Sequence, residues 1–174
     1  MAGRTEGRIE GRTEGRIWRL PADIDTDVLA PGRWMKGDLA TLAAHCLEAV
    51  RPEFAREVRP GDVIAAGPNF GVGSSREQAA GALKHLGVAA VIAPSFAGIF
   101  YRNAINLGLP VLRCAAAESL AEGECVTIEL SAGVVTRESG SIIRCEPLPP
   151  FLWDIVAAGG LFASLKRRPL RPES

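Results

Sequence analysis

The sequence lacks the features that mark several large classes of protein. Its 174 residues contain 20 Lys and Arg against 20 Asp and Glu, so no excess of positive charge points to nucleic acid or an anionic membrane surface as the main partner. No apolar run approaches the ~20 residues that a membrane-spanning helix needs. The N-terminus has no apolar signal segment, and its glutamates argue against a transit peptide. We therefore expect a cytoplasmic protein that binds neither nucleic acid nor a membrane.

Cysteine is scarce as well. The chain has four cysteines, and they are widely spaced: Cys46, Cys114, Cys125 and Cys145. They form no CxxC pair and no Cys/His cluster, which argues against a metal or iron–sulfur site built by this chain alone. Reduced, mostly buried thiols are the simplest interpretation of this spacing.

The two ends of the chain differ in composition from its middle. From Gly3 the tetrapeptides GRTE, GRIE, GRTE and GRIW follow one another, rich in glycine and in charges of alternating sign. Such a repeat has no face that could form a core, so we expect residues 1–14 to be a disordered tail. We expect one domain over residues 15–165, and a solvated basic tail, KRRPLRPES, over residues 166–174.

Residues 62–112 alternate between strand-like and helical patterns. Short apolar runs at 63–66, 88–93 and 109–112 are separated by helical patterns at 77–86 and at 96–107, the second of which we expect Ser95 to cap. This alternation is typical of a parallel α/β unit.

The flanking residues predict further elements. We expect an opening strand at 17–20, a helix from 39 to about 50 capped by Asp38, short antiparallel strands at 126–130, 134–137 and 142–145, and a final helix at 149–158. The fold class is therefore α/β, a parallel core with added antiparallel strands.

The stretch NFGVGSSREQ at residues 69–78 combines the features of an anion-binding site. Gly71 and Gly73 allow backbone conformations and close approaches that other residues resist. Ser74 and Ser75 add hydroxyl donors, and Arg76 adds a planar cationic fork suited to a carboxylate. The stretch leads into a helix whose first amide groups are unpaired, so it predicts a cradle for a carboxylate or phosphate. The alternative interpretation is a serine-capped helix with a surface arginine.

Other chemistries fit this stretch less well. No GKS or GKT follows the glycines, as a Walker loop requires, and the third glycine of the dinucleotide fingerprint is missing. The two histidines, His45 and His85, fall within expected helices, and the chain has no GxSxG elbow. Both facts argue against a Ser-His-Asp hydrolase.

Two longer segments carry a specific resemblance to a known family. DIDTDVLAPGR, followed by GPNFGVGSSREQAAGALKHLGVAAVIAPSFAGIFYRNAINLGLP, resembles the small subunits of 3-isopropylmalate dehydratases. That family is similar to the swivelling domain of aconitase. The resemblance covers roughly residues 15–165, and it implies the swivelling β/β/α fold of the aconitase C-terminal domain.

The resemblance also implies a partner and a reaction. Such a small subunit docks on a large subunit that carries a [4Fe–4S] cluster with one open iron site, which acts as a Lewis acid on the substrate. The reaction is a reversible dehydration of a 2-hydroxy dicarboxylic acid, followed by rehydration at the neighbouring carbon. The present chain would hold no cofactor and no metal itself, in agreement with its dispersed cysteines.

Residue by residue, the family pattern assigns the catalytic base to Ser74. As an alkoxide, Ser74 would remove the proton from the carbon next to a carboxylate, in the positive surroundings of a helix start and Arg76. Ser75 and Arg76 would bind a substrate carboxylate. Asp27, in the DTD stretch, resembles an acid that approaches the active site; its alternative interpretation is an Asx-type turn before Pro31.

The stretch Arg33–Trp34–Met35–Lys36 corresponds to the substrate-selecting loop of the family. Trp34 and Met35 keep the apolar character that suits an isopropyl group. Lys36 introduces a charge, and relatives that act on a tricarboxylate carry a cation in this loop. The resemblance therefore favours 3-isopropylmalate as substrate, in leucine biosynthesis, and leaves homocitrate, citramalate or another 2-alkylmalate open. A hypothesis of a different class is a stand-alone module that binds carboxylate or phosphate without catalysis.

Overall fold

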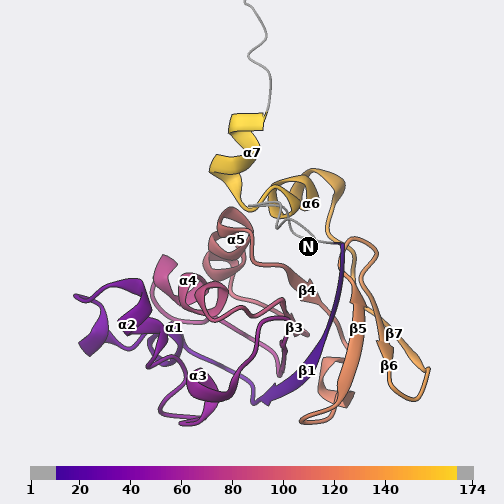
Figure 1. Cartoon of the computed structure of the whole chain (residues 1–174), viewed down its shortest axis with the longest axis horizontal. Coiled ribbons are helices and arrows are strands. Elements are labelled where there is room, and N and C mark those ends of the chain that lie inside the picture. The colour runs from indigo at the N-terminus through magenta and orange to yellow at the C-terminus, as the bar shows by residue number, and fades with distance from the viewer. Residues whose placement is uncertain (1–10, 168–174) are drawn as a thin grey trace, which may run out of the picture.

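The computed structural model describes residues 11–167, and its centre is a mixed sheet of seven strands (Figure 1). The strands are β1 (Arg12–Leu20), β2 (Val63–Ala66), β3 (Ala90–Ala93), β4 (Val111–Arg113), β5 (Cys125–Glu129), β6 (Val134–Arg137) and β7 (Ile142–Arg144). Their order is β4-β3-β2-β1-β5-β6-β7. The pairs from β4 to β1 are parallel and those from β1 to β7 are antiparallel, which confirms the predicted parallel core with added antiparallel strands.

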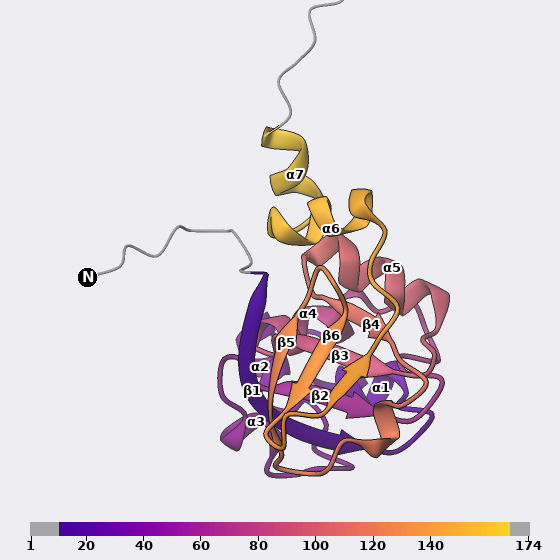
Figure 2. The same cartoon turned by 90° about the vertical axis from the view of Figure 1, so that its right-hand side faces the viewer.

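Strand β1 joins the two halves of the sheet because it changes partner along its length. Its last four residues, from Ile17 to Leu20, pair in parallel with β2, whereas Arg12 to Arg16 pair in antiparallel with β5. Figure 2 shows β1 curving along one edge of the molecule beneath the β5–β6–β7 strands. The strand begins before residue 15, so the predicted tail boundary at residue 14 is wrong by three residues; residues 1–10 lie outside the described part.

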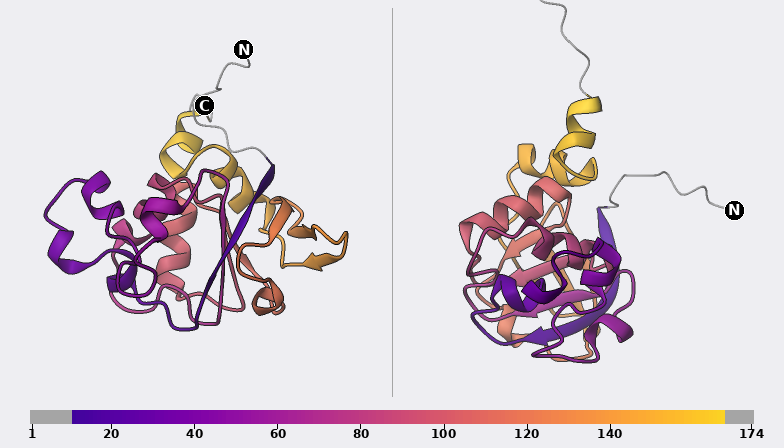
Figure 3. Two further views of the ribbon diagram at one scale, coloured as in Figure 1. Left: turned by 60° about the horizontal axis from the view of Figure 1, so that its bottom comes forward. Right: turned by 90° about the vertical axis from the view of Figure 1, so that its left-hand side faces the viewer.

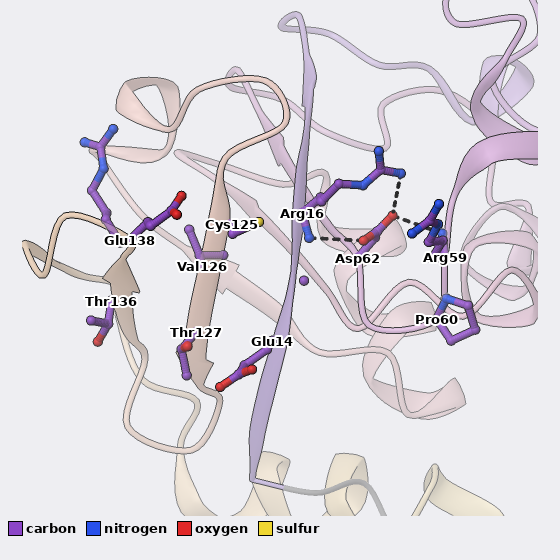
Figure 4. A pocket seen from close by; sticks show the side chains of 12 residues that line it. Glu14, Arg16, Arg59, Pro60, Asp62, Cys125, Val126, Thr127, Thr136 and Glu138 are labelled. Atoms are coloured by element: carbon purple, nitrogen blue, oxygen red, sulfur yellow. Dashed lines mark hydrogen bonds and ion pairs between the residues drawn. The ribbon is translucent and has the colours of Figure 1, made fainter.

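A buried carboxylate fixes the point at which β1 changes partner. The side chain of Asp62 accepts hydrogen bonds from the Arg16 amide and the Arg59 amide, each at 3.0 Å (Figure 4). It also accepts one from the Trp18 indole at 3.0 Å. Arg16 adds an ion pair at 3.4 Å. Burial would raise the pKa of the Asp62 carboxyl, but the hydrogen bonds from Trp18, Arg59 and Arg16 outweigh it, and the pKa lies below its ordinary value.

The same carboxylate borders an open pocket of about 480 Å³ between β1, β5 and β6. None of the residues that line this pocket belongs to the predicted site. It therefore lies apart from the chemistry that the sequence predicts.

Helices cover the parallel half of the sheet. The longer ones are α4 (Glu77–His85), α5 (Gly98–Leu107), α6 (Pro150–Ala157) and α7 (Leu161–Arg167). The shorter ones are α1 (Thr26–Leu29), η1 (Gly32–Trp34), α2 (Leu39–Ala43), α3 (Phe54–Glu57) and η2 (Ala117–Ser119). Helices α1, α2 and α4 lie at the opposite end of the molecule from β6 and β7 (Figures 1 and 3). No helix among the described residues is long and apolar enough to cross a membrane.

The helix predicted from residue 39 to residue 50 begins as expected but ends early. Asp38 does cap it, because its carboxylate accepts the Thr41 amide at 2.8 Å, but the helix ends at Ala43. The chain then forms tight turns, and at Leu47 it takes a left-handed conformation with φ of 63°. The Leu47 amide donates to the carbonyl of Val28 at 2.9 Å, so a contact with a distant segment replaces the helical hydrogen bond.

Three further boundaries differ from the prediction. The predicted helix at 96–107 begins at Gly98 with Ala97 as its N-cap, so Ser95 does not cap it. Helix α7 was not predicted, and it includes the first residues of the predicted basic tail, whereas residues 168–174 lie outside the described part. The opening strand predicted at 17–20 begins five residues earlier, at Arg12, and the other predicted strands and helices are observed within about two residues of the predicted bounds.

Asp62 provides a test of how the two halves are held together. We expect Asp62→Ala to lower the free energy of unfolding by about 3 kcal/mol, because it leaves the buried Trp18 indole, two part-buried amides and the Arg16 charge without their partner. Chemical denaturation monitored by circular dichroism measures this. The matched control is Asp154→Ala at an exposed position of α6, which should change stability by less than about 0.5 kcal/mol. Equal effects of the two substitutions would contradict the role of Asp62.

The same group makes stability depend on pH. Its folded-state pKa is lowered, so its contribution is complete above the pKa of the unfolded carboxyl, about 3.9, and is lost as the pH falls through the folded-state value. We therefore expect the stability difference between the parent and Asp62→Ala to be constant from pH 5 upward, on the order of the value above, and to shrink below about pH 4. Denaturation curves across this range would show it; a difference that grows on acidification would contradict the assignment.

Candidate functional site

Three loops meet at the carboxyl ends of the parallel strands. They follow β1, β2 and β3 and comprise residues 21–26, 67–76 and 94–97. Isolated parallel bridges join them, Asp25 to Val72 and Phe70 to Phe96. The carboxyl edge of a parallel sheet is the usual place for a ligand site in α/β folds, and here it holds the GSSRE stretch.

The two glycines of this stretch are required by close approaches. Gly71 has φ of 83°, and a Cβ there would lie 2.2 Å from the ring of Phe100. Gly73 has φ of 106°, and its Cβ would lie 2.9 Å from the carboxylate oxygens of Asp25. Both side chains would clash in a conformation that L-residues rarely adopt. Gly73 therefore lets the loop pass against the segment that follows β1, and Gly71 lets it pass against α5.

That passage brings Ser74 beside a buried hydroxyl. The Oγ of Ser74 lies 3.4 Å from Oγ1 of Thr26, which is buried, whereas Ser74 and Ser75 are exposed. Helix α4 has Arg76 as its N-cap and no side-chain cap. The alternative of a serine-capped helix is therefore wrong, and both serines are exposed residues just before the helix.

Arg76 links this loop to the segment after β1. Its Nη1 donates to the carboxylate of Asp27 and, at 2.9 Å, to the carbonyl of Ala30. The Asp27 carboxylate also accepts the Gly32 amide at 3.0 Å. The hydrogen bonds from Arg76 and from Gly32 lower the pKa of Asp27. The Asx-type cap in this segment is made by Asp25, which accepts the Asp27 amide at 2.7 Å, so Asp27 itself is an ion-pair partner.

The predicted substrate-selecting loop begins at Arg33, directly after Gly32, whose amide bonds to Asp27. Arg33 and Trp34 lie in η1, and Met35 follows as its C-cap. Trp34 and Met35 are partly buried, whereas Lys36 is exposed. Among the described residues, no salt bridge involves Lys36. The structure thus brings Asp27, the loop and the GSSRE stretch to one edge of the sheet.

The sequence did not predict the role of Glu48, whose carboxylate contacts two side chains of this loop. The Glu48 carboxylate accepts hydrogen bonds from Nη2 of Arg33 and from Nε1 of Trp34, the latter at 3.4 Å. Nδ1 of His45 lies 2.7 Å from its other oxygen. Hydrogen bonds with Arg33, His45 and Trp34 lower the pKa of Glu48 to about 2. The prediction of a continuous helix through residue 50 hid this cluster, and a hydrophobic pattern carries no signal for it.

Asn69 and Ser95 have structural roles at this edge. Asn69 has φ of 60°, its amide donates to Oγ of Ser95 at 2.9 Å, and its side chain donates to Asp23 at 3.0 Å. These bonds tie the three loops together. The Ser95 hydroxyl is occupied by Asn69 instead of capping α5.

The described residues contain no group of three or more His, Cys, Asp or Glu side chains that could hold a metal ion. Cys46, Cys114 and Cys145 are buried and Cys125 is exposed. Burial raises the pKa of Cys46 and of Cys145, so neither is a thiolate ready to bind metal. Residues 11–167 therefore contain no set of side chains suited to bind a catalytic iron–sulfur cluster.

The chain is similar to dehydratase small subunits. A family model described as the aconitase C-terminal domain matches residues 53–117. A methanogen homoaconitase small subunit from Methanothermobacter thermautotrophicus is 50% identical over 148 residues, which are 84% of this chain and 86% of that protein. A 3-isopropylmalate dehydratase small subunit from Nautilia profundicola is 47% identical over 148 residues, 84% of this chain and 89% of that protein.

A solved structure agrees with these relatives. The crystal structure of 3-isopropylmalate dehydratase (leuD) from Methanocaldococcus jannaschii superimposes with a TM-score of 0.85 at 42% identity and covers 90% of this chain and 94% of that one. It confirms the swivelling-domain fold that the sequence implies. The chain therefore belongs to the aconitase-related family of 3-isopropylmalate dehydratase and homoaconitase small subunits.

Proposed function

We propose that this chain is the small subunit of a 3-isopropylmalate dehydratase, which interconverts 2-isopropylmalate and 3-isopropylmalate by dehydration and rehydration in leucine biosynthesis. The observation that carries the proposal is the exposed pair Ser74 and Ser75, set at the mouth of α4 beside Arg76, in a chain 47% identical to a dehydratase small subunit. A large subunit would hold the [4Fe–4S] cluster, and this cluster would supply Lewis-acid chemistry toward the substrate hydroxyl.

In this proposal Ser74 is the base that removes a proton from the carbon next to a carboxylate. A free serine is a poor base, so its alkoxide must be stabilised where it forms. The unpaired amides at the start of α4 and the Arg76 guanidinium, two residues away, supply positive potential at that point. Thr26 Oγ1, at 3.4 Å, is placed to donate to the alkoxide. Ser75 and the outer edge of Arg76 bind a substrate carboxylate, while Asp27 holds Arg76 in place.

A second candidate is a homoaconitase-type reaction on a substrate with an extra carboxylate. Two observations favour it: the methanogen homoaconitase small subunit is 50% identical, and Lys36 is exposed in the substrate-selecting loop. A cation there would bind the additional carboxylate. Trp34 and Met35 favour the isopropyl group instead, because their partly buried apolar surfaces suit an alkyl substituent.

Reconstitution tests both candidates and the assembly. The chain is mixed without air with a cluster-loaded large subunit from the same source, and absorbance of the unsaturated intermediate is followed with isopropylmalate, citramalate and homocitrate in parallel. We expect turnover of isopropylmalate. Turnover of homocitrate alone would establish the second candidate, and turnover of citramalate alone would indicate another 2-alkylmalate. Failure to form a complex, together with tight carboxylate binding by the isolated chain, would support a stand-alone binding module.

Substitution of the proposed base tests the mechanism. We expect Ser74→Ala to lower kcat by about 10²- to 10⁴-fold, because the proton transfer loses its base, while complex formation is unchanged. Steady-state kinetics and size-exclusion chromatography of the complex measure the two effects. Ser139→Ala, at an exposed turn after β6, is the matched control and should leave kcat unchanged. Turnover near the parent level would remove Ser74 from the mechanism.

Lys36 separates the two substrates. If isopropylmalate is the substrate, Lys36→Met should leave KM within about twofold, since an exposed cation then makes no contact that the reaction uses. If the substrate carries an extra carboxylate, the same change should raise KM by roughly tenfold or more, because a charge-assisted hydrogen bond is lost. Lys166→Met, at an exposed position of α7, is the control for a loss of surface charge.

A further inference from the structure

Glu48 is the centre of a polar cluster that touches the substrate-selecting loop but lies outside it. It contacts Arg33 and Trp34, which are 15 and 14 residues away, and His45 within its own turn. Its side chain is 26% exposed and that of Arg33 is 71% exposed, so the carboxylate forms the sheltered side of the pair. A surface pair alone contributes little, but here three side chains converge on one carboxylate.

Aromatic packing reinforces the same cluster. The ring of Trp34 stacks on His45 with 3.7 Å between centroids and 5° between planes. The guanidinium carbon of Arg33 lies 5.6 Å from the centroid of the same Trp34 ring. The side chains of Arg33 and Trp34 are therefore each held by two contacts, and both residues are fixed from the side where Glu48 lies.

The backbone conformation between Ala43 and Glu48 places the Glu48 side chain beside Arg33 and Trp34. The chain leaves α2 at Ala43, and Leu47, fully buried, takes a left-handed conformation that a branched side chain rarely adopts. Its amide bonds to Val28, so the next residue turns back toward η1. If α2 continued beyond Ala43 as a regular helix, Glu48 would lie further along the axis of that helix instead of turning back toward η1. Unusual backbone conformations of this kind occur preferentially where a side chain must be aimed.

We propose that Glu48 is a positioning residue for substrate selectivity: it holds Arg33 away from the substrate and fixes the orientation in which Trp34 lies beside Met35 and Lys36. This inference rests on the proposed function, because it assumes that residues 33–36 contact substrate. Arg33 is then a structural cation whose charge is matched by Glu48. The selectivity of the loop then depends on Trp34, Met35 and Lys36, because Arg33 does not compete for a substrate carboxylate.

Removing Glu48 should free Arg33 and Trp34 together. In the full chain, we expect Glu48→Ala to raise hydrogen exchange of the amides of residues 33–37 by at least about tenfold, since two immobilised side chains are released. Exchange in α4 and β2 should not change. The matched control is Glu57→Ala, which removes the carboxylate of an exposed ion pair with Arg56 at 3.3 Å away from the loop. Glu48→Gln keeps an acceptor oxygen without the charge and should give an intermediate effect.

The reconstituted complex tests the consequence for substrates. We expect Glu48→Ala to raise KM by about tenfold with kcat within about twofold, and to shift the ratio of kcat/KM between homocitrate and isopropylmalate toward homocitrate, because a mobile Arg33 can then reach an extra carboxylate. Loss of fold alone would lower the active fraction, and hence kcat, without shifting this ratio. Glu57→Ala should change neither KM nor the ratio.

The outcomes separate this inference from the proposed function. Unchanged exchange at residues 33–37 would overturn the positioning role, whatever the activity. Increased exchange with unchanged KM and unchanged ratio would overturn the link to selectivity. If the unaltered complex turns over none of the tested acids, the proposed function fails, the selectivity role falls with it, and the exchange measurement still decides whether Glu48 fixes the loop.

Discussion

The arrangement of the site depends on one guanidinium that joins two distant segments. Arg76, which follows β2, bonds to Asp27 and to the Ala30 carbonyl, which follow β1, across 49 and 46 residues of chain. An isolated surface ion pair contributes little. This one belongs to a network, because Asp27 also binds the Gly32 amide. The proposed base Ser74 lies two residues before Arg76, and the proposed substrate-selecting loop, residues 33–36, directly follows Gly32, so this network links the two.

The fold explains why these segments can meet at all. Strands β1 and β2 are neighbours in parallel, so the loops after Leu20 and Ala66 leave the sheet at the same edge. That pairing depends on β1 changing partner at the point where Asp62 binds Arg16 and Trp18. The antiparallel strands β5, β6 and β7 hold the other half of β1 and contribute no residue to the site. Their role is to anchor the strand from which the site begins.

Local sequence signals predicted one part of this structure and could not predict the other. The alternation over residues 62–112 and the glycines of GVGSSRE are local, so they predicted the parallel unit and the loop at its edge. The end of α2 at Ala43 follows from the bond between Leu47 and Val28, and the pairing of Arg12 with Glu129 spans most of the chain. Contacts between distant residues leave no periodic pattern, which is why Glu48 and the start of β1 were missed.

The separation between Ser74 and the loop has a consequence for how one fold serves several substrates. The loop is held by two carboxylates, Asp27 at its start and Glu48 at its side, and neither bond involves the side chains of Met35 or Lys36. Those two positions can therefore change without moving Arg76 or Ser74. A chain with similar identity to a homoaconitase subunit and to a 3-isopropylmalate dehydratase subunit fits this division, because function resides in a few side chains on a shared scaffold. In the proposed function the chemistry lies at the start of α4, and Met35 and Lys36 help to select the substrate on a neighbouring loop, which Asp27 links to Arg76.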